Sequence, residues 1–248
     1  MTSDTTQTEW AAPVTENLKR VIAEAENVLF DFDGPICRLF AGHHAHEVAE
    51  SLVAWLEEHG RHVLLTEEER VSGDPHAVLR AVDRIHPGSD LVEELEERLT
   101  REELRAARTA WPTAYADPLI QTLKAVGVRL AIATNNSPRV ARAYLADRGL
   151  TACFGPHVYG RTTDLHLLKP DPDCIRRALT SLGARAADSL MIGDTVTDLY
   201  AAQAAGVSFL GYARNEEKAK RLHAAGAETV VVSMLPVLEA VRQRSVQA

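Results

Sequence analysis

The chain has 248 residues, which is enough for one large domain or two small ones around a substantial core. With 46% hydrophobic and 25% charged residues it has the composition of a globular protein, and its net charge of −8 gives no reason to expect a nucleic-acid partner. No apolar run approaches the roughly 18 residues of a membrane span, and residues 1–8 lack the pattern of a signal peptide. Three widely spaced cysteines fit a reducing compartment, so we expect a cytoplasmic protein that does not contact a membrane.

Hydrophobic periodicity and glycine positions predict the elements in chain order. A flexible tail over residues 1–14 precedes a short helix near 15–25 and a first strand near 27–32. Residues 38–112 contain no convincing strand, and helices are predicted there over 43–59, 75–86 and 89–110. Helices are then predicted near 117–126, 138–148, 172–182, 196–205, 215–225 and 235–245, and strands near 128–133, 157–159, 189–192, 207–211 and 229–232.

Strands that alternate with helices predict an α/β fold, in which helices cover both faces of a parallel sheet. We therefore expect a core domain made of residues 15–37 and 113–248, interrupted by an all-helical domain over 38–112. Ligands of open α/β sheets bind beyond the carboxyl ends of the strands. The insert leaves the core at one such end and can cover the site as a lid.

Two aspartates, Asp31 and Asp33, follow the first predicted strand. Their spacing places both carboxylates on the same side, where they repel each other unless a cation lies between them or one keeps a proton. The pair therefore has two natural uses. It can hold a hard cation such as Mg²⁺, or it can divide the roles of nucleophile and acid/base.

Further polar residues end the later strands or lie in loops near them. These are Thr134, Asn135, Lys169 (followed by Pro170), and Asp194 and Asp198 in Gly193-Asp194-Thr195-Val196-Thr197-Asp198.

This set suits phosphoryl transfer. Asp31 can attack phosphorus, and Asp33 can protonate the leaving oxygen and then deprotonate water. Asp194 can hold Mg²⁺ together with Asp31 and a backbone carbonyl, and Asp198 can orient that site. Thr134 can bind phosphate oxygens, and Lys169 can neutralise charge on the nucleophile and the phosphate.

In this order, the motifs resemble those of the haloacid dehalogenase superfamily of phosphohydrolases. The family pattern is an Asp-x-Asp after a strand, a Thr or Ser ending a strand, a Lys often followed by Pro, and Gly-Asp-x-x-x-Asp. Asp31-Phe32-Asp33-Gly34, Thr134, Lys169-Pro170 and residues 193–198 match it. A helical insert between the first two motifs resembles a C1-type cap, as in the phosphoglycolate phosphatase and β-phosphoglucomutase branch.

The resemblance implies a Rossmann-like core, dependence on Mg²⁺ and an aspartyl-phosphate intermediate. It implies catalytic roles for Asp31, Asp33 and Lys169, and a metal site of Asp31, Asp33 through its carbonyl, Asp194 and supporting Asp198. Phosphate-binding or substrate-binding residues would be Gly34, Arg38, Thr134 and Asn135. Pro35 departs from the family pattern, because the family usually has Thr or Val there, and proline fixes φ and removes an N–H.

Within the superfamily, Asp33 favours phosphate monoesters, because halide leaves without a proton and the dehalogenase branch lacks a second aspartate. Residues 38–112 contain no lysine, which argues against a phosphonate-cleaving enzyme that forms a Schiff base. Two alternatives stay open: a phosphomutase, and a non-catalytic member that binds or regulates. The expected partner is a small phosphorylated metabolite, with a sugar phosphate or a phosphoglycolate-like acid as the default, and the protein is expected to be a monomer or homodimer.

The residues that would select the substrate are not fixed by the pattern. Arg38 can meet a substrate anion or be a solvated charge, and Arg161 can contact phosphate or lie at the surface. His43, His44 and His46 lack the spacing of ligands on one helical face. The exposed-helix interpretation is therefore preferred for these histidines.

Overall fold

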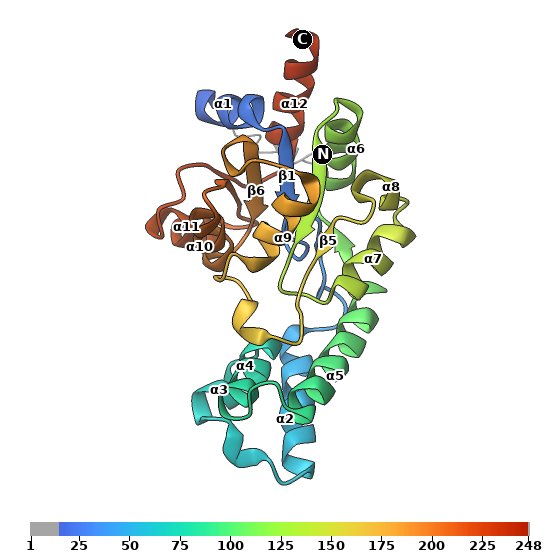
Figure 1. The fold of residues 1–248 in the computed structure, drawn as a ribbon, viewed down its shortest axis with the longest axis vertical. Helices are drawn as coiled ribbons and strands as arrows, with labels where there is room; N and C mark the ends of the chain where they lie inside the picture. Colours follow the sequence, from blue (N-terminus) through green and yellow to red (C-terminus); the bar gives the residue numbers. More distant parts are fainter. Residues whose placement is uncertain (1–14, 248) are drawn as a thin grey trace, which may run out of the picture.

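The computed structural model describes residues 15–247, which form a six-stranded parallel sheet between two helical layers and a further group of helices at one end (Figure 1). The tail expected over residues 1–14 lies outside this described part. None of the described helices combines the length and apolar character needed to cross a membrane.

The core contains β1 (Asn27–Phe30), β4 (Arg129–Ala133), β5 (Val158–Tyr159), β6 (Ser189–Gly193), β7 (Ser208–Tyr212), β8 (Val230–Val231), α1 (Glu16–Glu24), α6 (Ala116–Ala125), α7 (Pro138–Asp147), α8 (Thr151–Phe154), α9 (Asp173–Leu182), α10 (Val196–Ala205), α11 (Glu216–Ala224) and α12 (Leu235–Gln247), with 3-10 turns η2 (Leu165–Leu167) and η3 (Ala186–Asp188). The insert contains α2 (Ala45–Glu58), η1 (His62–Leu64), α3 (Glu67–Val71), α4 (Pro75–Ile85) and α5 (Asp90–Ala107), between β2 (Cys37–Arg38) and β3 (Trp111–Pro112).

The strand order is β5-β4-β1-β6-β7-β8, and every neighbouring pair is parallel. β1 is buried along its whole length because both of its faces are covered. Val28 and Phe30 pack in the layer that contains α1, α6 and α12, whereas Leu29 packs with residues of α9 and α10. The predicted α/β fold is thus confirmed, and its central strand carries the first motif to the carboxyl edge of the sheet.

The helical insert has an apolar cluster of its own, formed mainly by leucines and valines of α2, α4 and α5. Leu165 and Leu168, from a core loop, complete this cluster. Figure 1 shows α2–α5 at one end of the molecule and α1 and α12 at the opposite end. The insert therefore covers one end of the core with a cluster of its own, while Ala106 at the end of α5 joins the main apolar core and Phe40 packs against both clusters.

Several details differ from the predicted elements, among them the short helices α3 and α8, which were not predicted. The first strand ends at Phe30 instead of continuing to residue 32, because the chain turns sharply through Gly34, whose φ is +112°. The segment 38–112 contains the predicted helices, but its ends are extended, with Arg38 paired to Trp111 in a two-stranded antiparallel sheet. Each of these strands has two residues, which is too short to produce a recognisable alternation.

Candidate active site

Asp31 and Asp33 lie just beyond the carboxyl end of β1. The Asp31 N–H donates to the carbonyl of Ile192, which extends the sheet by one residue and fixes the backbone. Asp31 Oδ1 accepts a hydrogen bond from the Phe32 N–H at 2.8 Å, and Asp33 Oδ1 accepts one from the Leu39 N–H at 2.8 Å. Both carboxylates are therefore oriented by backbone donors of the turn that follows the strand.

Gly34 occupies a position that no other residue fits well. A Cβ atom there would lie 2.4 Å from Cγ of Asp194, and the positive φ adds strain for any residue with a side chain. Its N–H donates to the Cys37 carbonyl, so this group is already engaged within the turn. Gly34 thus lets the turn approach Asp194 closely.

Lys169 is buried between the first and fourth motifs. Its Nζ atom lies 3.0 Å from Asp31 Oδ1 and 2.5 Å from Asp198 Oδ1, and it donates to the Ala133 carbonyl at 3.0 Å. The Asn135 side chain holds the backbone of this lysine from both sides, accepting from its N–H and donating to its carbonyl. Asn135 therefore positions the Lys169 backbone, and it also lines the catalytic cavity.

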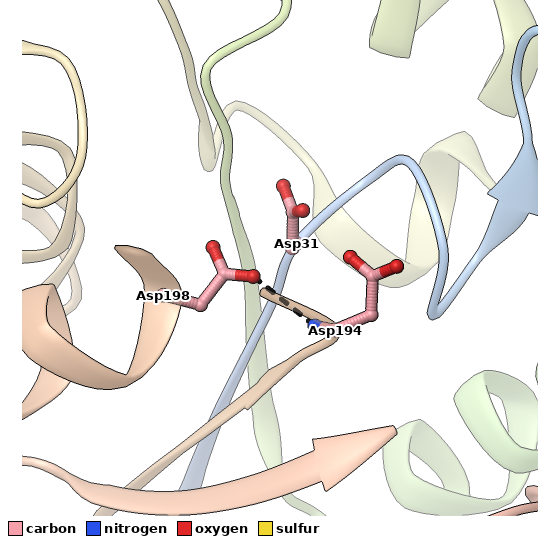
Figure 2. Close-up of side chains that lie close together, drawn as sticks. All are labelled: Asp31, Asp194 and Asp198. Carbon is pink, nitrogen blue, oxygen red and sulfur yellow. Dashed lines mark hydrogen bonds between the residues drawn. The ribbon is translucent and has the colours of Figure 1, made fainter. Parts of the chain in front are cut away.

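Asp194 and Asp198 come from the loop after β6 and the first turn of α10. Asp198 and Thr195 form a capping box, in which Asp198 Oδ2 accepts from the backbone N–H groups of Asp194 and Thr195. The dashed line in Figure 2 marks the first of these bonds. Asp194 Oδ2 is paired with Lys218, from the first turn of α11.

The electrostatics of this cluster are unbalanced. Four carboxylates, those of Asp31, Asp33, Asp194 and Asp198, face two ammonium groups, those of Lys169 and Lys218, which leaves an excess of two negative charges. Burial raises the pKa of Asp31 to about 7, with Asp198 adding to the rise and Lys169 offsetting part of it. Burial also raises the pKa values of Asp33 and Asp194 to about 6.

This charge excess and donor set fit a divalent cation. Oxygen atoms of Asp31, Asp194 and Asp198 lie within 4.8 Å of one another, and Figure 2 shows Asp31 and Asp194 side by side at the strand ends. Hard cations such as Mg²⁺ prefer carboxylate oxygens. Both oxygens of Asp198 already accept hydrogen bonds, so Asp31 and Asp194 are the better-placed ligands.

A second network of buried charges lies behind the Thr134 loop. The Arg161 guanidinium pairs with Glu103 of α5 at 2.9 Å, and both side chains are fully buried. Glu103 also accepts from the Asn136 side chain and the Ser137 N–H at the start of α7. Arg161 is thus neither a surface residue nor directed at the cavity, and the pair links the insert to this loop.

A cavity of about 380 Å³ brings most of the predicted site residues together. Asp31, Asp33, Thr134, Asn135, Lys169, Asp194 and Asp198 line it, together with Asp74, His76 and Arg80 of the insert and Lys218. Arg38 lies outside this cavity, in an adjoining hollow. His43 pairs with Glu102, and the His44 and His46 rings stack with centroids 5.5 Å apart, so the three rings do not converge on one point.

The sequence interpretation missed Lys218, His76 and Glu103. Lys218 lies in the first turn of α11, after the carboxyl end of β7, so the rule that ligands bind beyond strand ends points to this stretch but does not single out Lys218. His76 lies in the first turn of α4, and its Nε2 atom is 3.1 Å from the Asn135 carbonyl oxygen. No local pattern distinguishes Glu103 from the other acidic residues of α5, because its buried partner is 58 residues away.

Comparisons with known proteins give a consistent result. The model of the haloacid dehalogenase-like hydrolase family matches residues 25–206. The chain is 41% identical to a phosphoglycolate phosphatase of Rhodospirillum rubrum over 44% of its length, a match that spans 45% of that protein. It is 30% identical to a phosphoglycolate phosphatase of Neisseria gonorrhoeae, over 78% of this chain and 82% of that one. The crystal structure of a predicted phosphatase from Clostridium acetobutylicum has the same fold, with a TM-score of 0.66, 20% identity, and coverage of 88% of this chain and 98% of that one.

Proposed function

The chain belongs to the haloacid dehalogenase-like hydrolases, and on that basis we propose that it hydrolyses a phosphate monoester of a small metabolite with Mg²⁺. The relatives named phosphoglycolate phosphatase support a phosphatase within this family. We include in the proposal that the insert, residues 38–112, acts as a cap domain, since its residues Asp74, His76 and Arg80 line the same cavity as Asp31.

In the first half-reaction, a carboxylate oxygen of Asp31 attacks phosphorus and the bond between phosphorus and the ester oxygen breaks. Asp33 gives its proton to the leaving oxygen, which departs as an alcohol. The raised pKa of Asp33, about 6, supports this role, because a fraction of the side chain carries a proton near neutral pH. Lys169, 3.0 Å from Asp31, offsets the negative charge that gathers on the nucleophile and the phosphoryl group.

In the second half-reaction, water attacks the phosphorus of the aspartyl-phosphate. Asp33, now ionised, takes a proton from that water, and the bond between Asp31 and phosphorus breaks to regenerate the carboxylate. A bound Mg²⁺ would be held by Asp31, Asp194 and the Asp33 carbonyl, and it would reduce the repulsion between carboxylate and phosphate. Asp198 orients the site through its bonds to Lys169 and to the Asp194 N–H.

One observation carries the proposal. Asp31, Asp33, Lys169 and Asp194 come from three separate stretches of the chain, and all line one cavity at the carboxyl edge of the sheet. Buried carboxylates with raised pKa values and too few cations are typical of functional sites.

The direct test is phosphate release from p-nitrophenyl phosphate, with Mg²⁺ and with EDTA, for the wild type and Asp31→Asn. We expect release that needs Mg²⁺ and that falls by about 10³-fold or more in Asp31→Asn, because the nucleophile is lost. Trapping and mass analysis of the wild-type protein should find added phosphate on Asp31.

A matched control is Asp171→Asn, which changes a nearby aspartate that does not line the cavity. This control should keep wild-type activity. Turnover that survives Asp31→Asn would contradict the mechanism. If p-nitrophenyl phosphate and a panel of phosphorylated metabolites all stay intact, and beryllofluoride with Mg²⁺ gives no thermal shift, the chain is a non-catalytic binding protein instead.

A further inference from the structure

A second hollow, of about 510 Å³, adjoins the catalytic cavity and shares Asp33, Asp194 and Lys218 with it. It lies between the start of the insert and the loop that follows β7. A substrate whose phosphate reaches Asp31 can therefore extend its remaining atoms into this hollow.

Five of the described residues that line this hollow have basic side chains. They are Arg38 from β2, His44 and His46 at the start of α2, Arg214 before α11, and Lys218. Within residues 15–247, the carboxylates in the lining are those of Asp33 and Asp194, which belong to the catalytic cluster. Lys218 is already paired with Asp194, so the uncommitted positive charge comes mainly from the two arginines.

Arg38 and Arg214 have no carboxylate partner among the described residues, whereas arginines nearby in the insert and the core pair with Glu69, Glu97 or Glu103. The Arg38 guanidinium lies over the Trp111 ring, 5.3 Å from its centroid, which orients it without neutralising it. Tyr212 also lines the hollow, where burial and Asp194 raise the pKa of its hydroxyl and Arg214 and Arg38 offset part of the rise. Both cations thus line the same hollow, one from β2 and the other from the segment between β7 and α11.

We propose that this hollow is a subsite for a second anionic group, a carboxylate or a phosphate, on the same small substrate, and that Arg38 and Arg214 bind it. Guanidinium groups match the planar geometry of carboxylates and the oxygen triad of phosphates, and they keep their charge at any physiological pH. The net charge of −8 and the acidic catalytic cluster would otherwise repel a substrate with two anionic ends. The inference rests on the proposed phosphatase activity and narrows its substrate class.

The test compares substrates that differ only in the second charge. Phosphoglycolate is paired with ethyl phosphate, which tests a carboxylate, and a hexose bisphosphate is paired with the hexose monophosphate, which tests a phosphate. For each pair, the ratio of kcat/KM values is measured in the wild type, Arg38→Gln, Arg214→Gln and the double variant. We expect the wild type to prefer one doubly anionic substrate, and each single change to reduce that preference about tenfold.

Arg242→Gln is the matched control, because Arg242 is an exposed arginine of α12, which Figure 1 places at the other end of the molecule. Its preference ratio should equal that of the wild type. A ratio that stays the same in the double variant, or a wild type without preference in either pair, would overturn the subsite. A preference for only one pair identifies the second group as carboxylate or phosphate.

A binding measurement separates this inference from the proposed activity. Calorimetry with Asp31→Asn and Mg²⁺ should give tighter binding of the doubly anionic compound than of its matched monoanionic partner, and the difference should disappear when Arg38 and Arg214 are also changed. This result would support the subsite even if no ester is hydrolysed. Equal binding of both compounds by Asp31→Asn would overturn it, whatever the activity assay shows.

Discussion

The catalytic cluster of buried carboxylates and the buried Glu103 of α5 have opposite electrostatics. Burial raises the pKa of Asp31, and the neighbouring Lys169 does not reverse this, because other carboxylates surround it. Burial also acts on Glu103, but Arg161 and His76 more than cancel it and hold the Glu103 pKa far below its usual range. A similar degree of burial therefore gives a proton-holding cluster in one place and a permanent ion pair in the other.

The difference shows which group is structural and which is prepared for a ligand. A buried charge is costly unless hydrogen bonds and an opposite charge satisfy it. The Glu103 carboxylate pairs with Arg161 and accepts hydrogen bonds from Asn136 and Ser137, so it requires no bound ion or ligand. The catalytic cluster lacks two positive charges, a deficit that a divalent cation would remove.

The largest effect on folding should follow when the satisfied pair is broken. Glu103→Gln leaves the Arg161 guanidinium buried and without its main counter-charge, which should cost roughly 3 kcal/mol of unfolding free energy. Asp31→Asn removes a carboxylate that the metal-free protein already disfavours at pH 8, so its stability should stay equal or rise. Urea denaturation in EDTA at pH 8 measures both.

Glu97→Gln makes the same chemical change on the same helix and also removes an ion pair between the insert and α7, but that pair is exposed. Its unfolding midpoint should therefore stay close to that of the wild type. Equal losses in Glu97→Gln and Glu103→Gln would refute the structural role of the buried pair. A strongly destabilised Asp31→Asn would refute the charge deficit.

A smaller effect should appear in the pH dependence of the metal-free protein. The folded-state pKa of Asp31 is about 7, whereas an unfolded aspartate has one near ~3.9, so the folded protein keeps protons that the unfolded chain releases. Stability from this cluster is therefore fully present below pH ~4 and is lost as the pH rises to about 7. Glu103 has a lowered pKa, so its contribution is fully present well above the unfolded-state pKa of about 4.3 and stays nearly constant between about pH 5.5 and 7.

Mg²⁺ should remove this dependence, because binding needs ionised carboxylates and stabilises the folded state. Thermal unfolding in EDTA and in Mg²⁺, at pH 5 and at pH 8, separates the effect of carboxylate protonation on stability from the effect of metal binding. We expect a larger rise in Tm with Mg²⁺ at pH 8 than at pH 5. A rise of the same size at both pH values would show that the cluster does not control metal binding.

The same contrast explains how much could be predicted from the sequence. The α/β fold and the positions of Asp31, Thr134, Lys169 and Asp194 at strand ends and loops follow from short-range patterns: apolar runs, glycine positions and motif spacing. The Arg161–Glu103 pair does not, because it joins residues 58 positions apart whose local surroundings are ordinary polar sequence. For the same reason Arg161 had no assigned place before the fold was known.

For residues within the motifs, the sequence also did not show which groups their side chains would contact. Asn135 is a predicted phosphate-binding residue, and its side chain also holds the Lys169 backbone, which the sequence did not show. Asp198 is predicted to support the metal site, and the sequence did not show that it would do so through bonds to Lys169 and the capping box of α10. Motif spacing identifies such residues. Only the tertiary contacts show whether a side chain binds the ligand or positions a neighbouring residue.

The smallest expected effect concerns Lys218, whose ammonium is one of the two positive charges in the catalytic cluster. Its ammonium pairs with Asp194 in the metal-free protein, and so it competes with a cation for the same carboxylate. Lys218→Met should tighten Mg²⁺ binding by about two- to fivefold, the value of one partly exposed ion pair, as measured by calorimetry. Lys220→Met, which breaks an exposed pair with Glu216 on the same helix, should leave the affinity unchanged. Weaker Mg²⁺ binding in Lys218→Met would mean instead that this lysine holds Asp194 in the orientation that the cation needs.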